Sequence, residues 1–192
     1  MIAVIKYNAG NIRSVMNALH RLGASAVLSD DPELVLRADK VILPGVGEAA
    51  SAMRYLQERG LDDALRRVTR PFLGICLGLQ LMCAHSEEGD TPCLGIFPNH
   101  VRRFPATGKV PHIGWNNLEA MRGPLFDGLP KGSDVYFVHS YCALPGIDTV
   151  ATCDYLMSIS AAMQRDHFYA VQFHPEKSAG SGERILQNFL AL

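Results

Sequence analysis

Residues 71–78 have the sequence Pro-Phe-Leu-Gly-Ile-Cys-Leu-Gly, and this stretch decides the fold class of the 192-residue chain. Residues 71–75 form a short apolar run typical of a buried strand, and a helix is expected to begin at Leu77. Residues 74–78 match the pattern G-x-C-x-G. At a strand-to-helix junction this pattern is typical of a tight turn that lifts one side chain clear, while the glycines avoid steric conflict. The stretch predicts a strand–helix unit with Cys76 at the turn.

The same alternation of short apolar runs and helix-period segments extends over the first 85 residues, as expected for βαβ units and a parallel sheet. Asn11 is predicted to cap one helix and Asp31 another. Further strands are predicted at 2–7, 26–29 and 40–43, and further helices at 48–59 and 61–68.

The helical periodicity fades between residues 87 and 132, where prolines and glycines predict loops and short strands. Strands are expected at 134–141 and 150–154, and the runs 156–164 and 168–173 flank a hairpin signal at 165–167. Ser181 is predicted to cap the last helix. The whole pattern predicts one α/β domain over residues 1–192, with a central, mostly parallel sheet, helices on both faces and an antiparallel extension in the C-terminal half.

The composition of the chain argues against several classes of function. Eighteen basic residues balance 19 acidic ones, so no net field attracts nucleic acid or an anionic membrane. No apolar run approaches the roughly 20 residues of a membrane span, and the N-terminus becomes polar too early for a signal peptide. The five cysteines include no C-x-x-C pair, which argues against a disulfide framework and a metal site. We therefore expect a cytoplasmic protein without metal or other cofactor.

Cys76 is the candidate nucleophile. A thiol at a helix N-terminus is favoured as thiolate by the helix dipole and the free backbone N–H groups. The backbone N–H of Leu77, directly after it, is positioned to stabilise an oxyanion. The alternative is that Cys76 is a buried residue that only packs a strand against a helix.

His174-Pro175-Glu176 supplies the candidate base and its partner. Proline favours extended geometry in the residue before it, and residues two apart in an extended segment face the same side. Glu176 can then hydrogen-bond His174 and hold it in the tautomer that a catalytic triad needs. Taken alone, these residues favour a core histidine at His174 and a surface charge at Glu176; Cys76 on a suitable turn reverses this and favours the triad.

The loop Pro44-Gly45-Val46-Gly47 follows the strand predicted at 40–43. It is compatible with a plain turn, or with a second backbone N–H aimed at the oxyanion. A phosphate cradle is not supported, since the chain has neither G-x-x-x-x-G-K-[ST] nor G-x-G-x-x-G.

Residues 74–80 together with Phe173-His174-Pro175-Glu176 resemble the class I, or triad, glutamine amidotransferases. The resemblance extends from the first strand to the last helix and implies a single domain with a flavodoxin-like, three-layer fold. Within the family, four segments are similar to the glutaminase subunits of imidazole glycerol phosphate synthase: residues 7–15, 43–47, 111–116 and 137–141. The chain departs from that pattern at Lys6, where an acidic residue is common, and at Asn8, where glycine is common.

The resemblance implies that Cys76 attacks the side-chain amide of glutamine, that His174 protonates the leaving ammonia and activates water, and that Glu176 orients His174. It implies an oxyanion hole formed by Val46, Gly47 and Leu77, competent only when a loaded partner is docked. Substrate-binding positions are implied at Gly47, Gln80, His139, Ser140 and Tyr141.

The implied partner is a (β/α)8-barrel cyclase subunit, with which the chain forms a heterodimer that makes imidazole glycerol phosphate and AICAR in histidine biosynthesis. Candidate interface residues are Pro111, His112, Trp115, Asn116 and Lys177. The alternatives are a glutaminase of anthranilate, GMP or pyridoxal phosphate synthesis, and a non-catalytic regulatory subunit of the same fold. A cysteine peptidase is also compatible with Cys-His chemistry, but nothing in the sequence indicates a peptide-binding groove.

Overall fold

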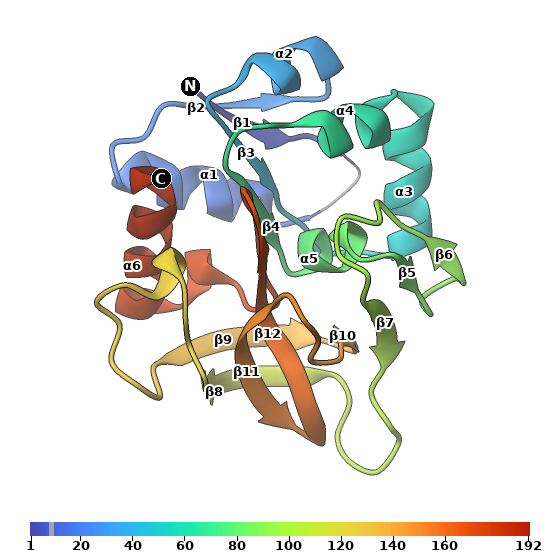
Figure 1. The fold of residues 1–192 in the computed structure, drawn as a ribbon, viewed down its shortest axis with the longest axis vertical. Helices are drawn as coiled ribbons and strands as arrows, with labels where there is room; N and C mark the ends of the chain where they lie inside the picture. Colours follow the sequence, from blue (N-terminus) through green and yellow to red (C-terminus); the bar gives the residue numbers. More distant parts are fainter. Residues whose placement is uncertain (8–9) are drawn as a thin grey trace.

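The structure is a computed structural model and describes residues 1–7 and 10–192, so Asn8, where the chain departs from the family pattern, lies outside the described residues. A seven-stranded sheet crosses the molecule in the order β11-β12-β13-β4-β3-β1-β2 (Figure 1). Its strands are β1 (Ile2–Ile5), β2 (Ala26–Ser29), β3 (Lys40–Leu43), β4 (Phe72–Ile75), β11 (Thr149–Tyr155), β12 (Met157–Arg165) and β13 (Phe168–Val171). The pairs from β13 to β2 are parallel, and β11, β12 and β13 pair antiparallel. The predicted mostly parallel sheet with its antiparallel extension is confirmed.

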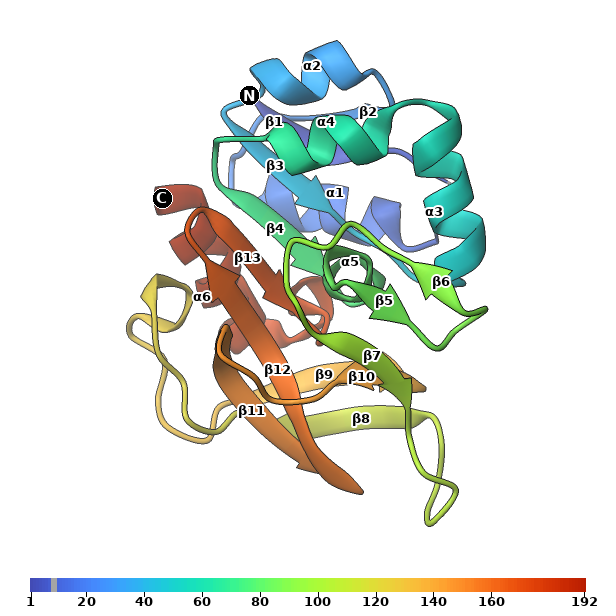
Figure 2. The ribbon, with the colours of Figure 1, turned by 45° about the vertical axis from the view of Figure 1, so that its right-hand side comes forward.

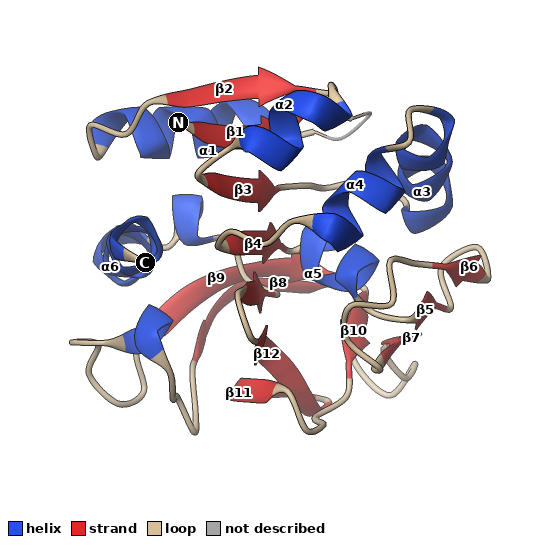
Figure 3. Ribbon diagram, turned by 45° about the horizontal axis from the view of Figure 1, so that its top comes forward, coloured by secondary structure: helices blue, strands red, loops and turns tan. Residues whose placement is uncertain are grey.

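Helices cover both faces of the parallel strands, as Figure 3 shows in a view along the sheet. One buried apolar cluster lies against the helices between β2 and β5, and the other against the first and last helices. The helices are α1 (Ile12–Arg21), α2 (Pro32–Arg37), α3 (Ala49–Glu58), α4 (Leu61–Arg67), α5 (Leu77–Met82) and α6 (Ala179–Ala191), with 3₁₀ turns η1 (Pro124–Phe126) and η2 (Pro175–Lys177). Within the described residues, no helix is long and apolar enough to cross a membrane.

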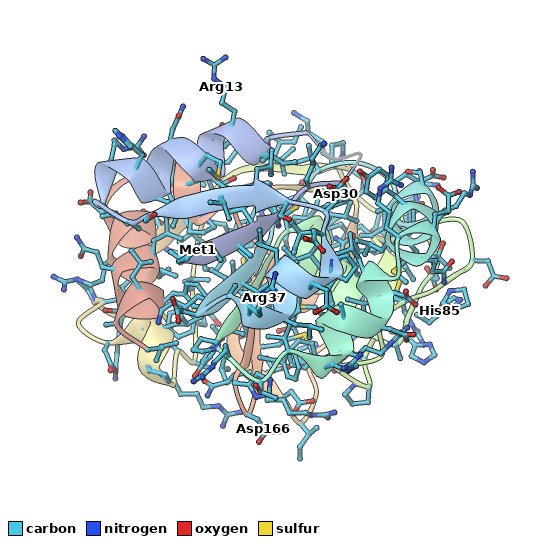
Figure 4. The ribbon with its side chains drawn as sticks, turned by 90° about the horizontal axis from the view of Figure 1, so that it is seen from above. Met1, Arg13, Asp30, Arg37, His85 and Asp166 are labelled. Atoms are coloured by element: carbon cyan, nitrogen blue, oxygen red, sulfur yellow. The ribbon has the colours of Figure 1, made fainter. Side chains whose placement is uncertain are left out.

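Helix α1 has the amphipathic pattern that its sequence predicted. Val15, Ala18 and Leu19 are buried against the sheet, while Arg13 projects away from the body of the molecule (Figure 4). The predicted cap is wrong in one respect, because Asn11 stands at the N-cap position in a left-handed conformation and its side chain makes no capping hydrogen bond. Its Nδ2 instead donates a hydrogen bond to Glu176 Oε1.

At the N-termini of α2 and α6, one capping prediction is confirmed and one is wrong. Asp31 caps α2 as expected, since its Oδ1 accepts a hydrogen bond from the Glu33 N–H at 3.0 Å. Helix α6 begins at Ala179, so the predicted cap at Ser181 is wrong. Ser178 precedes the helix, and its hydroxyl donates to the His174 carbonyl and accepts from the Tyr136 N–H, which ties the end of β13 to α6.

Two smaller sheets extend the fold beyond the expected one. The first has the order β10-β7-β5-β6, and the second is the ribbon β8-β9, which runs across the lower part of the molecule (Figure 2). Their strands are β5 (His85–Ser86), β6 (Thr91–Pro92), β7 (His100–Arg103), β8 (His112–Asn117), β9 (Asp134–His139) and β10 (Tyr141–Ala143). The strand predicted at 134–141 is therefore divided at Ser140, since β9 pairs with β8 and β10 pairs with β7.

The order of the large sheet brings three loops together. Strands β13, β4 and β3 are neighbours and parallel, so the segments that follow them lie at one edge. Strand β1 ends at Ile5, earlier than predicted, and the Tyr7 hydroxyl reaches across to donate to the Pro44 carbonyl of the loop after β3. In open α/β sheets, ligands bind beyond these carboxyl ends. Lys6 pairs with Asp30 at 3.9 Å, on the surface.

Candidate active site

Cys76 occupies a strained turn between β4 and α5. Its φ of 53° and ψ of −104° lie outside the regions that side chains favour. The turn is closed by a tight contact, since a Cβ on Gly78 would lie 1.9 Å from the Leu43 carbonyl oxygen. A Cβ on Gly74 would lie 2.9 Å from the Gly78 carbonyl carbon. Both glycines are thus required for backbone approach, as the G-x-C-x-G pattern predicted.

Gly78→Ala is expected to lower the free energy of unfolding by about 1–3 kcal/mol, the usual cost of overpacking, and to displace Cys76. The matched control is Gly180→Ala in α6, where an added Cβ meets nothing within 4 Å. That change is expected to stabilise the chain by about 0.5–1 kcal/mol, because alanine is the better helix former. Urea unfolding of both variants measures the difference, and equal effects would contradict the packing argument.

His174 and Glu176 form a buried pair behind Cys76. His174 Nδ1 and Glu176 Oε1 are 2.7 Å apart, and neither side chain is exposed. The segment is fixed by a hydrogen bond from the His174 N–H to the Tyr136 carbonyl at 2.9 Å. Since Nδ1 faces the carboxylate, the other ring nitrogen, Nε2, is free to exchange a proton, and it has no hydrogen-bond partner among the described residues.

Asn11 is a residue of this cluster that the sequence reasoning missed. Its Nδ2 donates to Glu176 Oε1 and lies 3.4 Å from His174 Nδ1. Burial lowers the pKa of His174, but the neighbouring sulfur of Cys76 and the Glu176 carboxylate outweigh it, so the pKa is raised above its usual value. The pair therefore favours a protonated imidazole beside the sulfur.

A cavity of about 180 Å³ opens over Cys76. All the residues predicted for the oxyanion hole and for substrate binding line it: Val46, Gly47, Leu77, Gln80, His139, Ser140 and Tyr141. Glu88 also lines it, and no motif in the sequence pointed to this residue. Burial raises the pKa of Glu88, and the N–H of Ala49, which donates to its Oε2 at 2.8 Å, partly opposes the shift. The cavity thus presents one carboxylate among backbone groups and amides.

One of the predicted oxyanion donors, the Leu77 N–H, is engaged with the chain itself. The Leu77 N–H donates to the Gly45 carbonyl at 3.2 Å, and the Val46 carbonyl accepts from the Gly10 N–H at 3.2 Å. Gly47 has a φ of 138°, a conformation open to glycine. In this conformation the Leu77 N–H is already bonded to the Gly45 carbonyl oxygen, and a carbonyl oxygen at that place repels an oxyanion.

The candidate interface residues fall into two groups. Trp115 is 54% exposed, Lys177 is exposed, and Pro111 and Asn116 are partly buried. His112 is only 3% exposed, because alternation along β8 turns it to the inner face, where it contacts His139. The structure therefore removes His112 from the exposed surface and places it beneath the ribbon.

Comparisons with known proteins agree with this geometry. The family model "Glutamine amidotransferase class-I" matches residues 3–192. Proteins named imidazole glycerol phosphate synthase subunit HisH are similar over the whole chain. The one from Bacteroides fragilis is 54% identical, covering 100% of this chain and 99% of its own, and the one from Dehalococcoides mccartyi is 43% identical, covering 100% and 97%.

Solved structures share the fold. A glutamine amidotransferase superposes with a TM-score of 0.78 at 22% identity, covering 100% of this chain and 98% of its own. The structure of PurLQS from Thermotoga maritima gives a TM-score of 0.71 at 20% identity, covering 99% and 97%. With the Cys76 turn and the buried His174–Glu176 pair, these similarities show that the chain belongs to the class I glutamine amidotransferases and, within them, to the HisH glutaminase subunits of imidazole glycerol phosphate synthase.

Proposed function

We propose that this chain, as one amidotransferase domain over residues 1–192, hydrolyses glutamine through Cys76, His174 and Glu176. The ammonia passes to a (β/α)8-barrel cyclase subunit that makes imidazole glycerol phosphate and AICAR. The observation that carries the proposal is the strained turn that places Cys76 in the 180 Å³ cavity, beside the buried His174–Glu176 pair. The five cysteines are free and buried, which supports a reducing, cytoplasmic location.

The chemistry takes two steps. The Cys76 thiolate forms a bond to the amide carbon of glutamine, and the C–N bond breaks as His174 gives its Nε2 proton to the departing nitrogen, which leaves as ammonia. Water then loses a proton to His174 and adds to the thioester, and the C–S bond breaks to release glutamate. Glu176 stays bonded to Nδ1 in both steps and stabilises the imidazolium.

The oxyanion hole is formed by a rotation of one peptide. Turning the Gly45–Val46 peptide would withdraw the carbonyl that now accepts from Leu77 and present the Val46 N–H in its place. Two N–H groups would then face the oxyanion, which is worth about 10²–10³ in rate per donor. The resting conformation accordingly favours a slow glutaminase that a partner accelerates.

Glutamine fits the groups that line the cavity. Its ammonium is complemented by the Glu88 carboxylate, and its backbone carboxylate by N–H groups of the Gly47 and Ser140–Tyr141 segments. Gln80 lies at the base, with its Nε2 donating to the Tyr141 carbonyl at 2.9 Å.

The barrel subunit docks on the outer face of the ribbon β8-β9, which we name the docking ribbon: Ile113, Trp115, Tyr136 and Val138. These residues are cross-strand neighbours, since Ile113 pairs with Val138 and Trp115 with Tyr136. Ile113 and Trp115 are each 54% exposed, an apolar pair of the kind that anchors interfaces. The ribbon also touches the site, because the Tyr136 carbonyl accepts from His174 and the Val138 carbonyl lies 3.8 Å from Cys76 Sγ. Pro111 directly precedes the ribbon, Asn116 lies within β8, and Lys177 directly follows Glu176 of the triad.

The first test measures glutamate release by the chain alone, and then with the barrel subunit and its nucleotide substrate. A slow rate that rises strongly with the loaded partner is expected. A fast rate that the partner leaves unchanged would contradict the gated oxyanion hole, and no release in any mixture would contradict the proposed function.

Trp115→Ser is expected to weaken binding of the barrel subunit by about 30-fold, because a central tryptophan contributes about 2 kcal/mol or more at an interface. The control is Ile147→Ser, which removes an apolar residue that is exposed but lies in the loop between β10 and β11. Calorimetric titration of the two chains measures both dissociation constants. Equal affinities would place the interface elsewhere.

A further inference from the structure

Two histidines contact each other on the inner face of the ribbon β8-β9, and the proposed chemistry does not use them. His112 of β8 and His139 of β9 are register partners, with 3.1 Å between His112 Nδ1 and His139 Nε2. Both are buried, and His112 is stacked between Tyr155, at 3.9 Å between ring centroids, and Phe137, at 4.7 Å. Such packing fixes both rings in place.

Both rings are neutral at physiological pH. Burial lowers the pKa of His112 to about 4. Burial also lowers the pKa of His139 to about 3; the Tyr141 carbonyl opposes this shift, and the nearby His112 and His174 add to it. A neutral imidazole has one nitrogen that donates and one that accepts, so a chain of such rings has a direction.

The direction follows from the partners at each end. The Tyr141 carbonyl can only accept, so His139 Nδ1, at 2.8 Å, carries the proton and its Nε2 accepts from His112 Nδ1. His112 Nε2 then accepts from Asn116 Nδ2 at 3.4 Å. The Asn116 amide is itself oriented, because Nδ2 donates to the Asp154 carbonyl at 3.1 Å and Oδ1 accepts from the Asn117 N–H at 2.8 Å.

The far end of this chain reaches the nucleophile. The Tyr141 carbonyl also accepts from Gln80 Nε2 at 2.9 Å, and the same nitrogen donates to Gln172 Oε1 at 3.1 Å. Gln172 Nε2 lies 3.7 Å from Cys76 Sγ. Hydrogen bonds therefore connect Asn116, beside the exposed Trp115, with the floor of the glutamine cavity.

We propose that this series of hydrogen bonds couples the docking ribbon to the glutamine cavity, with His112 and His139 as positioning residues. The inference rests on the proposed function. His139 holds the Tyr141 carbonyl, and with it Gln80, in the position that glutamine requires. Among these hydrogen bonds, the one from Asn116 Nδ2 to His112 Nε2, at 3.4 Å, is the longest apart from the contact with the Cys76 sulfur, and we expect a partner that presses on the ribbon to shorten it. Coupling between two binding sites is reciprocal. Bound glutamine therefore strengthens docking of the barrel subunit by the factor by which docking strengthens glutamine binding.

The test of positioning compares two changes at one residue. His139→Leu removes the donor to Tyr141 and is expected to raise KM for glutamine about tenfold while kcat falls less, since one hydrogen bond to the cavity wall is lost. His139→Asn keeps an N–H at the place of Nδ1 and is expected to restore most of the KM. A residue that merely filled space would show no rescue by asparagine.

The test of coupling uses two changes at the middle of the chain. His112→Phe keeps the aromatic stack and removes both ring nitrogens, and Asn116→Asp replaces the donor to His112 by an acceptor. Each is expected to reduce the stimulation of glutaminase by the loaded barrel subunit about fivefold. The control is His167→Asn, at a part-buried histidine that bonds the Val68 carbonyl far from the ribbon, and it is expected to leave the stimulation unchanged.

Nitrogen NMR of the whole chain, labelled at histidine, gives a readout that needs no activity. The two rings are expected as neutral imidazoles protonated at Nδ1, and His112→Phe shifts the His139 signals. Unchanged stimulation in both His112→Phe and Asn116→Asp, or an Nδ1 without a proton on His139, would overturn the inference. Absence of glutaminase activity in the unaltered complex would instead overturn the proposed function. The NMR result would then still decide whether the hydrogen bonds through His112 and His139 exist.

Discussion

Cys76→Ser is expected to lower the rate of glutamine hydrolysis by about 10⁴-fold or more, in the isolated chain and in the complex alike. The oxygen of serine is a much weaker nucleophile than a thiolate because its proton is held far more tightly. No other cysteine can take over as the nucleophile, because the other four are buried in the two apolar clusters and do not line the cavity. Glutamate release in a coupled assay measures the loss.

Synthesis with added ammonia separates chemistry from assembly. The complex that contains Cys76→Ser is expected to make product at the unaltered rate when ammonia is supplied, because in the proposed function the barrel subunit carries out the ring closure. Cys83→Ser is the matched control, since its sulfur is buried and donates to the Leu79 carbonyl, a bond that a hydroxyl also makes. Retained hydrolysis in Cys76→Ser would exclude Cys76 as the nucleophile.

The sequence predicts the parts of the site that depend on local geometry. The turn at Cys76 follows from glycines that stand two residues before and two after it, and its backbone angles and close contacts agree. The same holds for Asp31, whose side chain caps the helix that directly follows it. Where a residue's role is decided within one turn of chain, its neighbours in sequence suffice.

Residues whose partners lie far along the chain could not be predicted in this way. Asn11 has the position and chemistry of a helix cap, yet its amide bonds Glu176, 165 residues away. Glu88 lies in a stretch without periodicity, and only the small sheet β10-β7-β5-β6 brings it to the cavity. His112 was predicted as an interface residue, but the pairing of β8 with β9 turns it inward. Long-range pairing decided each of these positions.

The geometry of the triad predicts that His174 and Glu176 contribute unequally. His174→Ala removes the group that moves both protons, and it is expected to lower kcat by about 10²–10⁴-fold. Glu176→Gln keeps an oxygen at the position of Oε1, which can still accept from His174 Nδ1 and from Asn11. The new amide nitrogen takes the place of Oε2, a buried atom that has no hydrogen-bond partner among the described residues. Orientation survives this change, and only the negative charge is lost.

Glu176→Gln is therefore expected to retain about 10–100-fold more activity than His174→Ala, and Glu176→Ala to lie between them, because that change loses orientation as well as charge. Steady-state kcat for the three variants in the loaded complex measures the order, with ammonia-dependent synthesis as the check on assembly. If Glu176→Gln were as inactive as His174→Ala, the charge of Glu176 would be essential in its own right. Since the raised pKa of His174 depends on that charge and on the Cys76 sulfur, such a result would assign Glu176 to forming the thiolate–imidazolium pair rather than to orienting the ring.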